Sequence, residues 1–160
     1  MINLKPMKYS IIVLVSIFFI SCSNDNSSNQ AIIDYTVQNE KEIVAYIEKH
    51  NLVAQKSNSG LYYVINNIGE GERPNVNSNV TVAYKGYFTD GKIFDQSDSK
   101  GITFGLQQVI KGWTEGITYF KEGGSGILLI PSHLGYGSGG TNGIPGGSVL
   151  IFDVNLISVN

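Results

Sequence analysis

The sequence VAYKGYFTDGKIFDQS occupies residues 82–97 and predicts two antiparallel strands joined by a tight turn. The Asp-Gly pair at 90–91 lies between two runs rich in aromatic and β-branched residues, which is a strong signal for a β-hairpin. Before the turn, apolar residues alternate with polar ones over residues 80–85, as expected for a strand with one buried face. The returning strand places an aromatic ring, Phe94, next to a carboxylate, Asp95.

Further strands are predicted on both sides of this hairpin. Alternation over residues 61–66 and the apolar runs at 127–130 and 149–158 each suit a strand. One short helix is predicted over residues 109–120. Because strands are followed by a short helix and then by more strands, the sequence favours an α+β domain in which a helix covers one face of an antiparallel sheet.

An amphipathic helix is predicted ahead of the sheet. Asn39 followed by Glu42 has the spacing of a helix capping box, with Asn in place of the usual Ser or Thr. Ile43, Tyr46 and Ile47 then fall on one face of a helix of about three turns. Because so short a helix is marginal by itself, we expect it to pack on the β-rich domain rather than on a partner.

Composition limits the classes of function. The chain has 160 residues, a formal net charge of −2 and no basic stripe, so nucleic acid is not an expected partner. The single cysteine, Cys22, cannot form an internal disulfide, and His50 and His133 lie far apart in the sequence. We therefore expect neither a metal site nor a cofactor.

The first residues have the pattern of an export signal. Lys5 and Lys8 precede an apolar run at 11–20, which is about half of the ~20 residues that a membrane-spanning helix needs. The run ends in Phe-Ile-Ser-Cys, which resembles the bacterial lipobox, so Cys22 is expected to carry acyl chains and to become the mature N-terminus. A plain signal peptide with an incidental cysteine is the alternative.

Four segments are predicted from this pattern: a lipoprotein-type signal peptide at 1–21, a flexible polar tether at 22–37, a helical extension at 38–59 and the main domain at 60–160. Lipid on Cys22 would hold the domain at a membrane surface, since each buried CH₂ contributes ~0.8 kcal/mol. The uncharged residue after Cys22 favours the outer membrane, with the domain facing the periplasm. Exposure on the cell surface is the other arrangement.

Five ordered blocks resemble the FKBP-type peptidyl-prolyl cis–trans isomerases. Members of that family carry Val-x-Tyr-x-Gly, an Asp-Gly hairpin and Phe-Asp-x-Ser, as residues 82–97 do. The other blocks are VIKGWTEG at 109–116, Ile-Pro and Tyr-Gly within 130–137, Gly-Ile-Pro at 143–145 and LIFDV at 150–154. The resemblance covers about residues 60–157 and implies a curved antiparallel sheet wrapped around one short helix.

The resemblance also implies a pocket for a proline ring, with Trp113 as its floor. No nucleophile or metal is needed, because the catalyst has to bind the twisted amide better than the planar one. The backbone N–H of Ile110 and the hydroxyl of Tyr136 would hydrogen-bond substrate carbonyls, and Asp95 would orient Tyr84 or present a dipole to the amide. The implied catalytic residues are Tyr84, Phe94, Asp95, Ile110 and Tyr136. The implied substrate-binding residues are Ile102, Val109, Trp113, Ile144 and Phe152.

Structural alternatives exist for these residues. Trp113, Phe94 and Phe152 are of the aromatic type that dominates protein cores in general. Asp95 could have a purely structural role, hydrogen-bonded to a tyrosine or to the backbone.

The chain departs from the family at two places near the implied pocket. Gly146 and Gly147 stand where the family often has prolines, which predicts a looser loop over the pocket. Several members have an arginine after Phe-Asp-x-Ser that pairs with the aspartate, whereas this chain offers only Lys100 there.

Two functions follow from the resemblance. The first is a peptidyl-prolyl cis–trans isomerase, tethered to a membrane by lipid, that acts on X-Pro bonds of exported proteins; its partners would be proline-containing polypeptides and macrolide inhibitors. The alternative is a non-catalytic module that binds proline segments or acts as a chaperone, for instance within a cell-envelope machinery such as that of gliding motility.

Overall fold

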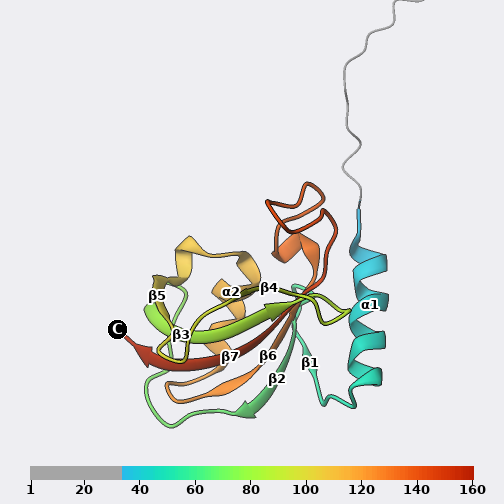
Figure 1. The fold of residues 1–160 in the computed structure, drawn as a ribbon. Helices are drawn as coiled ribbons and strands as arrows, with labels where there is room; N and C mark the ends of the chain where they lie inside the picture. Colours follow the sequence, from blue (N-terminus) through green and yellow to red (C-terminus); the bar gives the residue numbers. More distant parts are fainter. Residues whose placement is uncertain (1–33) are drawn as a thin grey trace, which may run out of the picture. The chain divides into compact units, whose positions relative to one another are not determined.

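The structure is a computed structural model and describes residues 34–160 (Figure 1). The predicted signal peptide, the predicted tether up to residue 33 and Cys22 lie outside the described residues. Within residues 34–160, no helix is both long enough and apolar enough to cross a membrane. The helices and strands are α1 (Thr36–Lys49), β1 (Gln55–Lys56), β2 (Tyr62–Asn67), β3 (Asn79–Tyr87), β4 (Ile93–Gln96), β5 (Ile102–Gly105), α2 (Lys111–Gly116), β6 (Ser125–Ile130) and β7 (Leu150–Val159). Short 3₁₀ turns lie at Leu106–Gln108, Ile117–Tyr119 and Ser132–Leu134.

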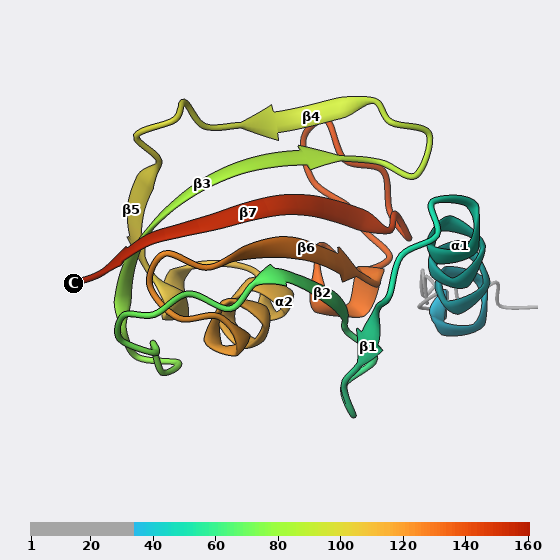
Figure 2. The same cartoon turned by 90° about the horizontal axis from the view of Figure 1, so that it is seen from below.

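All strand pairs of the sheet are antiparallel. The order is β1-β2-β6-β7-β3-β4, and β5 pairs with the first part of β3. The long strands β3 and β7 pair along most of their length and form the middle of the sheet, which curves around α2 (Figure 2). The predicted α+β architecture, a curved antiparallel sheet around one short helix, is confirmed.

Two glycines let helix α2 lie close to the sheet. A Cβ atom on Gly112 would come within 2.5 Å of the Ile130 side chain, and one on Gly116 within 2.7 Å of Leu128. The helix therefore presents a smooth face to β6, and its Trp113 and the following Ile117 are buried in the main core. The aromatic residues that are buried in this core, Trp113, Phe120 and Phe152, therefore lie on the α2 side of the sheet.

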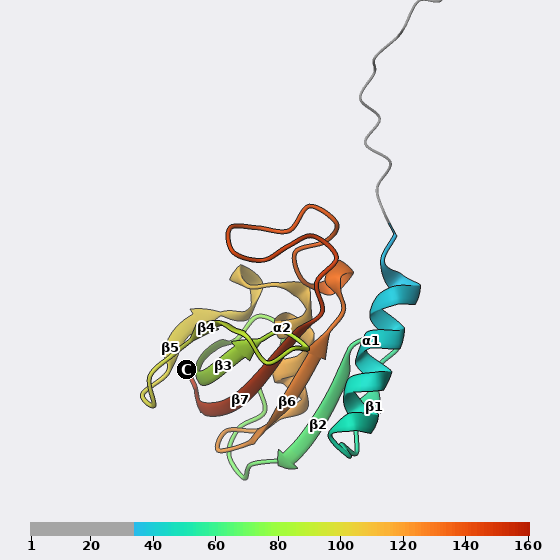
Figure 3. The ribbon, with the colours of Figure 1, turned by 45° about the vertical axis from the view of Figure 1, so that its right-hand side comes forward.

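Helix α1 packs on the other face of the sheet. In the β6–β7 pairing, Leu128 faces Phe152 and the next pair is Leu129 with Ile151, so the two pairs point to opposite faces. Leu129 and Ile151 form a second core with Ile43 of α1, which is fully buried. The expected packing of this helix on the β-rich domain is confirmed, and Figure 3 shows α1 beside β1 and β2.

The predicted helix cap at Asn39 is wrong. Helix α1 begins at Thr36, inside the segment expected to be tether, and its 14 residues make about four turns rather than three. The carboxylate of Asp34 accepts a hydrogen bond from the Thr36 N–H at 2.8 Å. Asn39 is instead fully buried within the helix, because its amide has partners in a distant loop, described below.

The remaining elements differ from expectation mainly at their ends. The hairpin forms as predicted, with Gly91 at φ 87° and the Asp90 carboxylate accepting the Lys92 N–H. Helix α2 begins two residues later than expected, because Val109 and Ile110 are extended, and it continues as a 3₁₀ turn to Tyr119. The sequence did not predict the short strands β1 and β5.

Candidate active site

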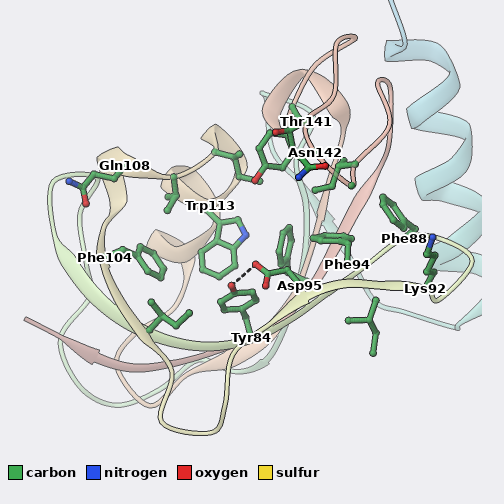
Figure 4. Close-up of a pocket in the computed structure, with 18 residues that line it drawn as sticks. Tyr84, Phe88, Lys92, Phe94, Asp95, Phe104, Gln108, Trp113, Thr141 and Asn142 are labelled. Carbon is green, nitrogen blue, oxygen red and sulfur yellow. Dashed lines mark hydrogen bonds between the residues drawn. The ribbon is translucent and has the colours of Figure 1, made fainter.

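A hollow of about 790 Å³ opens between the concave face of the sheet, helix α2 and the loop after β6 (Figure 4). Its wall is mostly aromatic and aliphatic. The lining residues are Tyr84, Phe88, Lys92, Ile93, Phe94, Asp95, Ile102, Phe104, Gln108, Val109, Ile110, Trp113, Tyr136, Thr141, Asn142, Gly143, Ile144 and Phe152.

Trp113 lies at the floor of the hollow and is held by three other rings. Its ring centroid is 5.1 Å from that of Tyr84, 5.4 Å from Phe104 and 5.1 Å from Phe152, each pair meeting edge to face. Such pairs add about 0.5–1.5 kcal/mol each beyond the area they bury. Because only 5% of Trp113 is exposed, the indole is fixed and offers one flat apolar surface to the hollow.

A glycine on β3 makes room for the wall beside this floor. Gly86 pairs with both Asp95 and Phe152, and a Cβ atom on it would lie 2.7 Å from the rings of Phe94 and Phe152. Without a side chain there, Phe94 meets Phe152 edge to face at 5.4 Å and contacts Phe88 at 4.9 Å. The Tyr-x-Gly spacing of the sequence thus places Tyr84 in the pocket and leaves space for two rings.

One pair of polar groups lies within the apolar wall. The hydroxyl of Tyr84 donates a 2.6 Å hydrogen bond to Oδ2 of Asp95 (Figure 4). Burial, followed by this hydrogen bond, raises the pKa of Tyr84 far above its ordinary value. Tyr84 is therefore a neutral donor at physiological pH, and Asp95 has a partner although the sequence has no arginine just after Phe-Asp-x-Ser. The ion pairs within residues 34–160 join Lys56 to Glu40 and Lys85 to Asp153, so Lys100 does not pair with Asp95.

The rim of the hollow is more exposed. Ile102 is 48% exposed and Tyr136 is 42% exposed. Ile144 is buried; it lies in the overhanging loop, residues 131–149, which joins β6 to β7. Ile110 precedes α2 in an extended conformation, with φ −61° and ψ 149°. An apolar floor with accessible polar groups at its edge suits a small cyclic or branched apolar group attached to an amide.

Residues 70–157 match the model of one protein family, described as FKBP-type peptidyl-prolyl cis–trans isomerase. The chain belongs to this family. FKBP-type isomerase FkpA of Escherichia coli strain K12 is 47% identical over 105 residues, which cover 64% of this chain and 39% of that protein. FkpA of Buchnera aphidicola from Schizaphis graminum is 40% identical over 142 residues, covering 84% of this chain and 56% of that protein. The chain thus spans about half the length of these curated relatives.

Solved structures of FKBP-type proteins have the same fold. The crystal structure of Escherichia coli FkpA superposes with a TM-score of 0.70 at 41% identity and covers 78% of this chain and 61% of that one. A Pseudomonas syringae peptidyl-prolyl cis–trans isomerase gives a TM-score of 0.68 at 31% identity and covers 78% of this chain and 96% of that one.

All ten site residues implied by the FKBP resemblance line the hollow. Their catalytic and binding roles stay predictions. The sequence did not single out Phe88, Lys92, Ile93, Phe104 and residues 141–143, which line the hollow as well. Phe104 lies on β5, a strand of four residues that is too short to show a clear alternation, and residues 141–143 lie in a glycine-rich loop without periodicity.

Helix α1 is hydrogen-bonded to the loop between β6 and β7, which the glycine content predicted to be loose. The Asn39 side-chain N–H group donates to the carbonyl of Gly147 at 2.7 Å, and its side-chain oxygen accepts the Ser132 N–H at 2.8 Å. These two contacts lie at the two ends of the loop that carries Tyr136 and Ile144. Gly147, at φ 76°, also has the Tyr35 ring within 2.4 Å of where a Cβ atom would lie, so the position requires glycine.

Among residues 34–160, no three His, Cys, Asp or Glu side chains lie close enough together to hold a metal ion. His133 lies in the 3₁₀ turn after β6, outside the hollow, where its Nε2 is 2.9 Å from the carbonyl oxygen of Ser59.

Proposed function

We propose that this protein is a peptidyl-prolyl cis–trans isomerase that binds X-Pro segments of exported polypeptides with the proline ring against Trp113. The observation that carries the proposal is the aromatic floor, 5% exposed and held by three edge-to-face rings, with a Tyr84–Asp95 pair in the adjoining wall. Family membership at 40–47% identity to proteins named as isomerases supports it.

The chemistry requires no covalent step. Rotation about an X-Pro bond crosses a barrier of about 18–20 kcal/mol, because the amide loses its resonance as it twists. The twisted amide has less charge separation than the planar one, so an apolar site that excludes water binds it relatively better. The rings of Trp113, Phe94 and Phe152 supply such a site.

Polar groups at the edge of the hollow would fix the peptide in register. We assign the Ile110 N–H and the Tyr136 hydroxyl to substrate carbonyls on the two sides of the twisting bond. The Tyr84 hydroxyl holds the Asp95 carboxylate beside the apolar wall by a hydrogen bond. In this arrangement the dipole of the carboxylate would face the substrate's X-Pro amide. Asp95 is not assigned a proton-transfer role, because no proton moves in this reaction.

A direct test is the isomerisation of a short Leu-Pro or Phe-Pro peptide by the purified protein. We expect acceleration over the spontaneous rate, which corresponds to tens to hundreds of seconds, and loss of the acceleration when a macrolide FKBP inhibitor fills the hollow. A rate equal to the spontaneous one, with the peptide still bound, would favour the non-catalytic proline-binding or chaperone module instead.

We further propose that the protein is anchored by lipid on Cys22 at the outer membrane, facing the periplasm. The support is the sequence: Lys5 and Lys8, the apolar run at 11–20 and the single cysteine, Cys22, two residues after that run ends. Expression in cells with radiolabelled palmitate should label the wild type and leave Cys22→Ser unlabelled. Equal recovery of both variants in the soluble periplasmic fraction would contradict the anchor, and protease treatment of intact cells would reveal surface exposure.

A further inference from the structure

The hollow around Trp113, where the proline is proposed to bind, is the prolyl pocket. A second hollow of about 420 Å³ adjoins it on its α1 side. The two hollows share Phe88, Lys92 and Gly143 as lining residues. In Figure 4, Phe88 and Lys92 lie at the end of the prolyl pocket nearest helix α1, opposite to Gln108. The surface is therefore continuous from the Trp113 floor to the helix.

Helix α1 forms the far wall of the second hollow. Gln38 and Glu42, four residues apart on one face of the helix, line it together with Tyr35 at the helix start. The other walls are the β3–β4 turn, through Thr89 and Asp90, and residues 145–149 of the overhanging loop. The buried Asn39 contacts with Gly147 and Ser132 hold helix and loop together, so this wall is fixed.

We infer that the second hollow binds the stretch of polypeptide that flanks the proline, with a preference for a basic side chain. The inference rests on the proposed isomerase function for the position of the proline itself. An extended chain advances about 3.3–3.6 Å per residue, so a few residues on one side of a proline in the first hollow lead across Phe88 and Lys92 into the second.

The charge of the lining supports the preference. Glu42 and Asp90 are carboxylates and Lys92 is the single cation among the lining residues, which leaves one negative charge in excess. Asp90 already accepts the backbone N–H of Lys92 within the turn. Glu42 accepts only a neutral partner, the Gln38 amide at 2.8 Å, among the contacts within residues 34–160. Glu42 is therefore the group to which a substrate cation would bind.

The test compares a Leu-Pro tetrapeptide with versions extended by four residues at either end, each carrying Lys or Glu. Binding is followed by the fluorescence of Trp113, the only tryptophan in the chain, and isomerisation is measured in parallel. At one end, the Lys peptide should bind about two- to fivefold more tightly than the Glu peptide, as expected for an exposed ion pair. The ratio should shrink as salt is added.

Two charge-reversal variants of the full chain assign the effect to a place. Glu42→Lys should abolish or invert the Lys-to-Glu ratio. Glu48→Lys makes the same change in the last turn of α1, away from the second hollow, and should keep the wild-type ratio. A ratio of one at both ends in the wild type, or an equal ratio in both variants, would overturn the inference.

The outcomes separate this inference from the proposed function. Charge-dependent binding without isomerisation would leave the second hollow in place and reject the isomerase. Isomerisation of all peptides at equal kcat/KM, with equal affinities, would support the isomerase function and reject the preference of the second hollow for a basic side chain. If no peptide binds, both are rejected.

Discussion

The hydroxyl of Tyr84 lies 2.6 Å from Oδ2 of Asp95 and donates a hydrogen bond to it across the β3–β4 pair. Tyr84, and not Lys100, is thus the side chain that pairs with this carboxylate. Tyr84 also meets Trp113 edge to face at 5.1 Å, so the same residue fixes the polar group and supports the floor. Loss of its hydroxyl alone should therefore separate the two roles.

Tyr84→Phe keeps the ring and removes the donor to Asp95. Since a net hydrogen bond contributes about 0.5–1.5 kcal/mol, we expect kcat/KM to fall roughly two- to tenfold with the fold intact. Asp95→Asn on the same background should cause little further loss, because the two residues act as a pair. Measurement of kcat/KM for the wild type, both single variants and the double variant gives the coupling. Strictly additive losses would contradict the pairing.

Gly86→Ala should disturb the packing of the two rings that form the pocket wall beside Trp113. A methyl group there would lie 2.7 Å from the rings of Phe94 and Phe152, so both rings must move. Overpacking of this kind costs about 1–3 kcal/mol in the free energy of unfolding, and we expect peptide affinity to fall with it. Gly139→Ala is the matched control, because nothing lies within 4 Å of its added methyl group. Denaturant titration and Trp113 fluorescence check both variants; equal effects would refute the packing argument.

Asn39→Ala should weaken the attachment of the overhanging loop to α1. The Gly147 carbonyl and the Ser132 N–H would each lose a partner in a buried site, at about 1–3 kcal/mol for each group. We expect lower stability together with faster amide hydrogen exchange in the loop that carries Tyr136 and Ile144. Val37→Ala on the same helix, at a side chain 69% exposed, should change stability by less than about 0.5 kcal/mol. Unchanged exchange in Asn39→Ala would contradict the attachment.

The raised pKa of Tyr119 predicts that the free energy of unfolding falls at alkaline pH. Burial, and then its hydrogen bond to Glu115, raise the pKa of Tyr119 from 10.0 to about 12. The folded state thus favours the neutral phenol, so this contribution is fully present below pH 10 and is lost as the pH rises through about 12. Denaturant titrations across this range should show the free energy of unfolding falling less steeply in Tyr119→Phe than in the wild type. Parallel curves would show that Tyr119 does not contribute.

The sequence predicted the parts of the fold that depend on local signals. The Asp-Gly turn placed the β3–β4 hairpin, and alternation placed β2 and β3, because turn chemistry and a two-residue period are properties of neighbouring residues. The ten residues expected at the site, all of which line the hollow, followed from the spacing of the FKBP-like blocks around Tyr84, Trp113 and Phe152.

The errors arose where distant contacts decide the structure. Asn39 has the local pattern of a helix cap, but its partners are 93 and 108 residues away, and two buried hydrogen bonds outweigh a cap worth about 1 kcal/mol. Strand β5 is defined by its pairing with β3 rather than by its own four residues, so Phe104 was missed. The second hollow likewise exists only because α1, the hairpin turn and the glycine-rich loop meet in space.

The isomerase function is tested most directly by the cis–trans exchange rate of a Leu-Pro peptide at equilibrium, measured by NMR exchange spectroscopy with wild-type protein and with Phe94→Ala. We expect exchange well above the spontaneous rate with the wild type. We expect a large fall in Phe94→Ala, whose fold is checked by circular dichroism, because the ring that meets Phe152 at 5.4 Å is gone. Exchange at the spontaneous rate with the wild type, or undiminished exchange with the folded variant, would contradict the isomerase function.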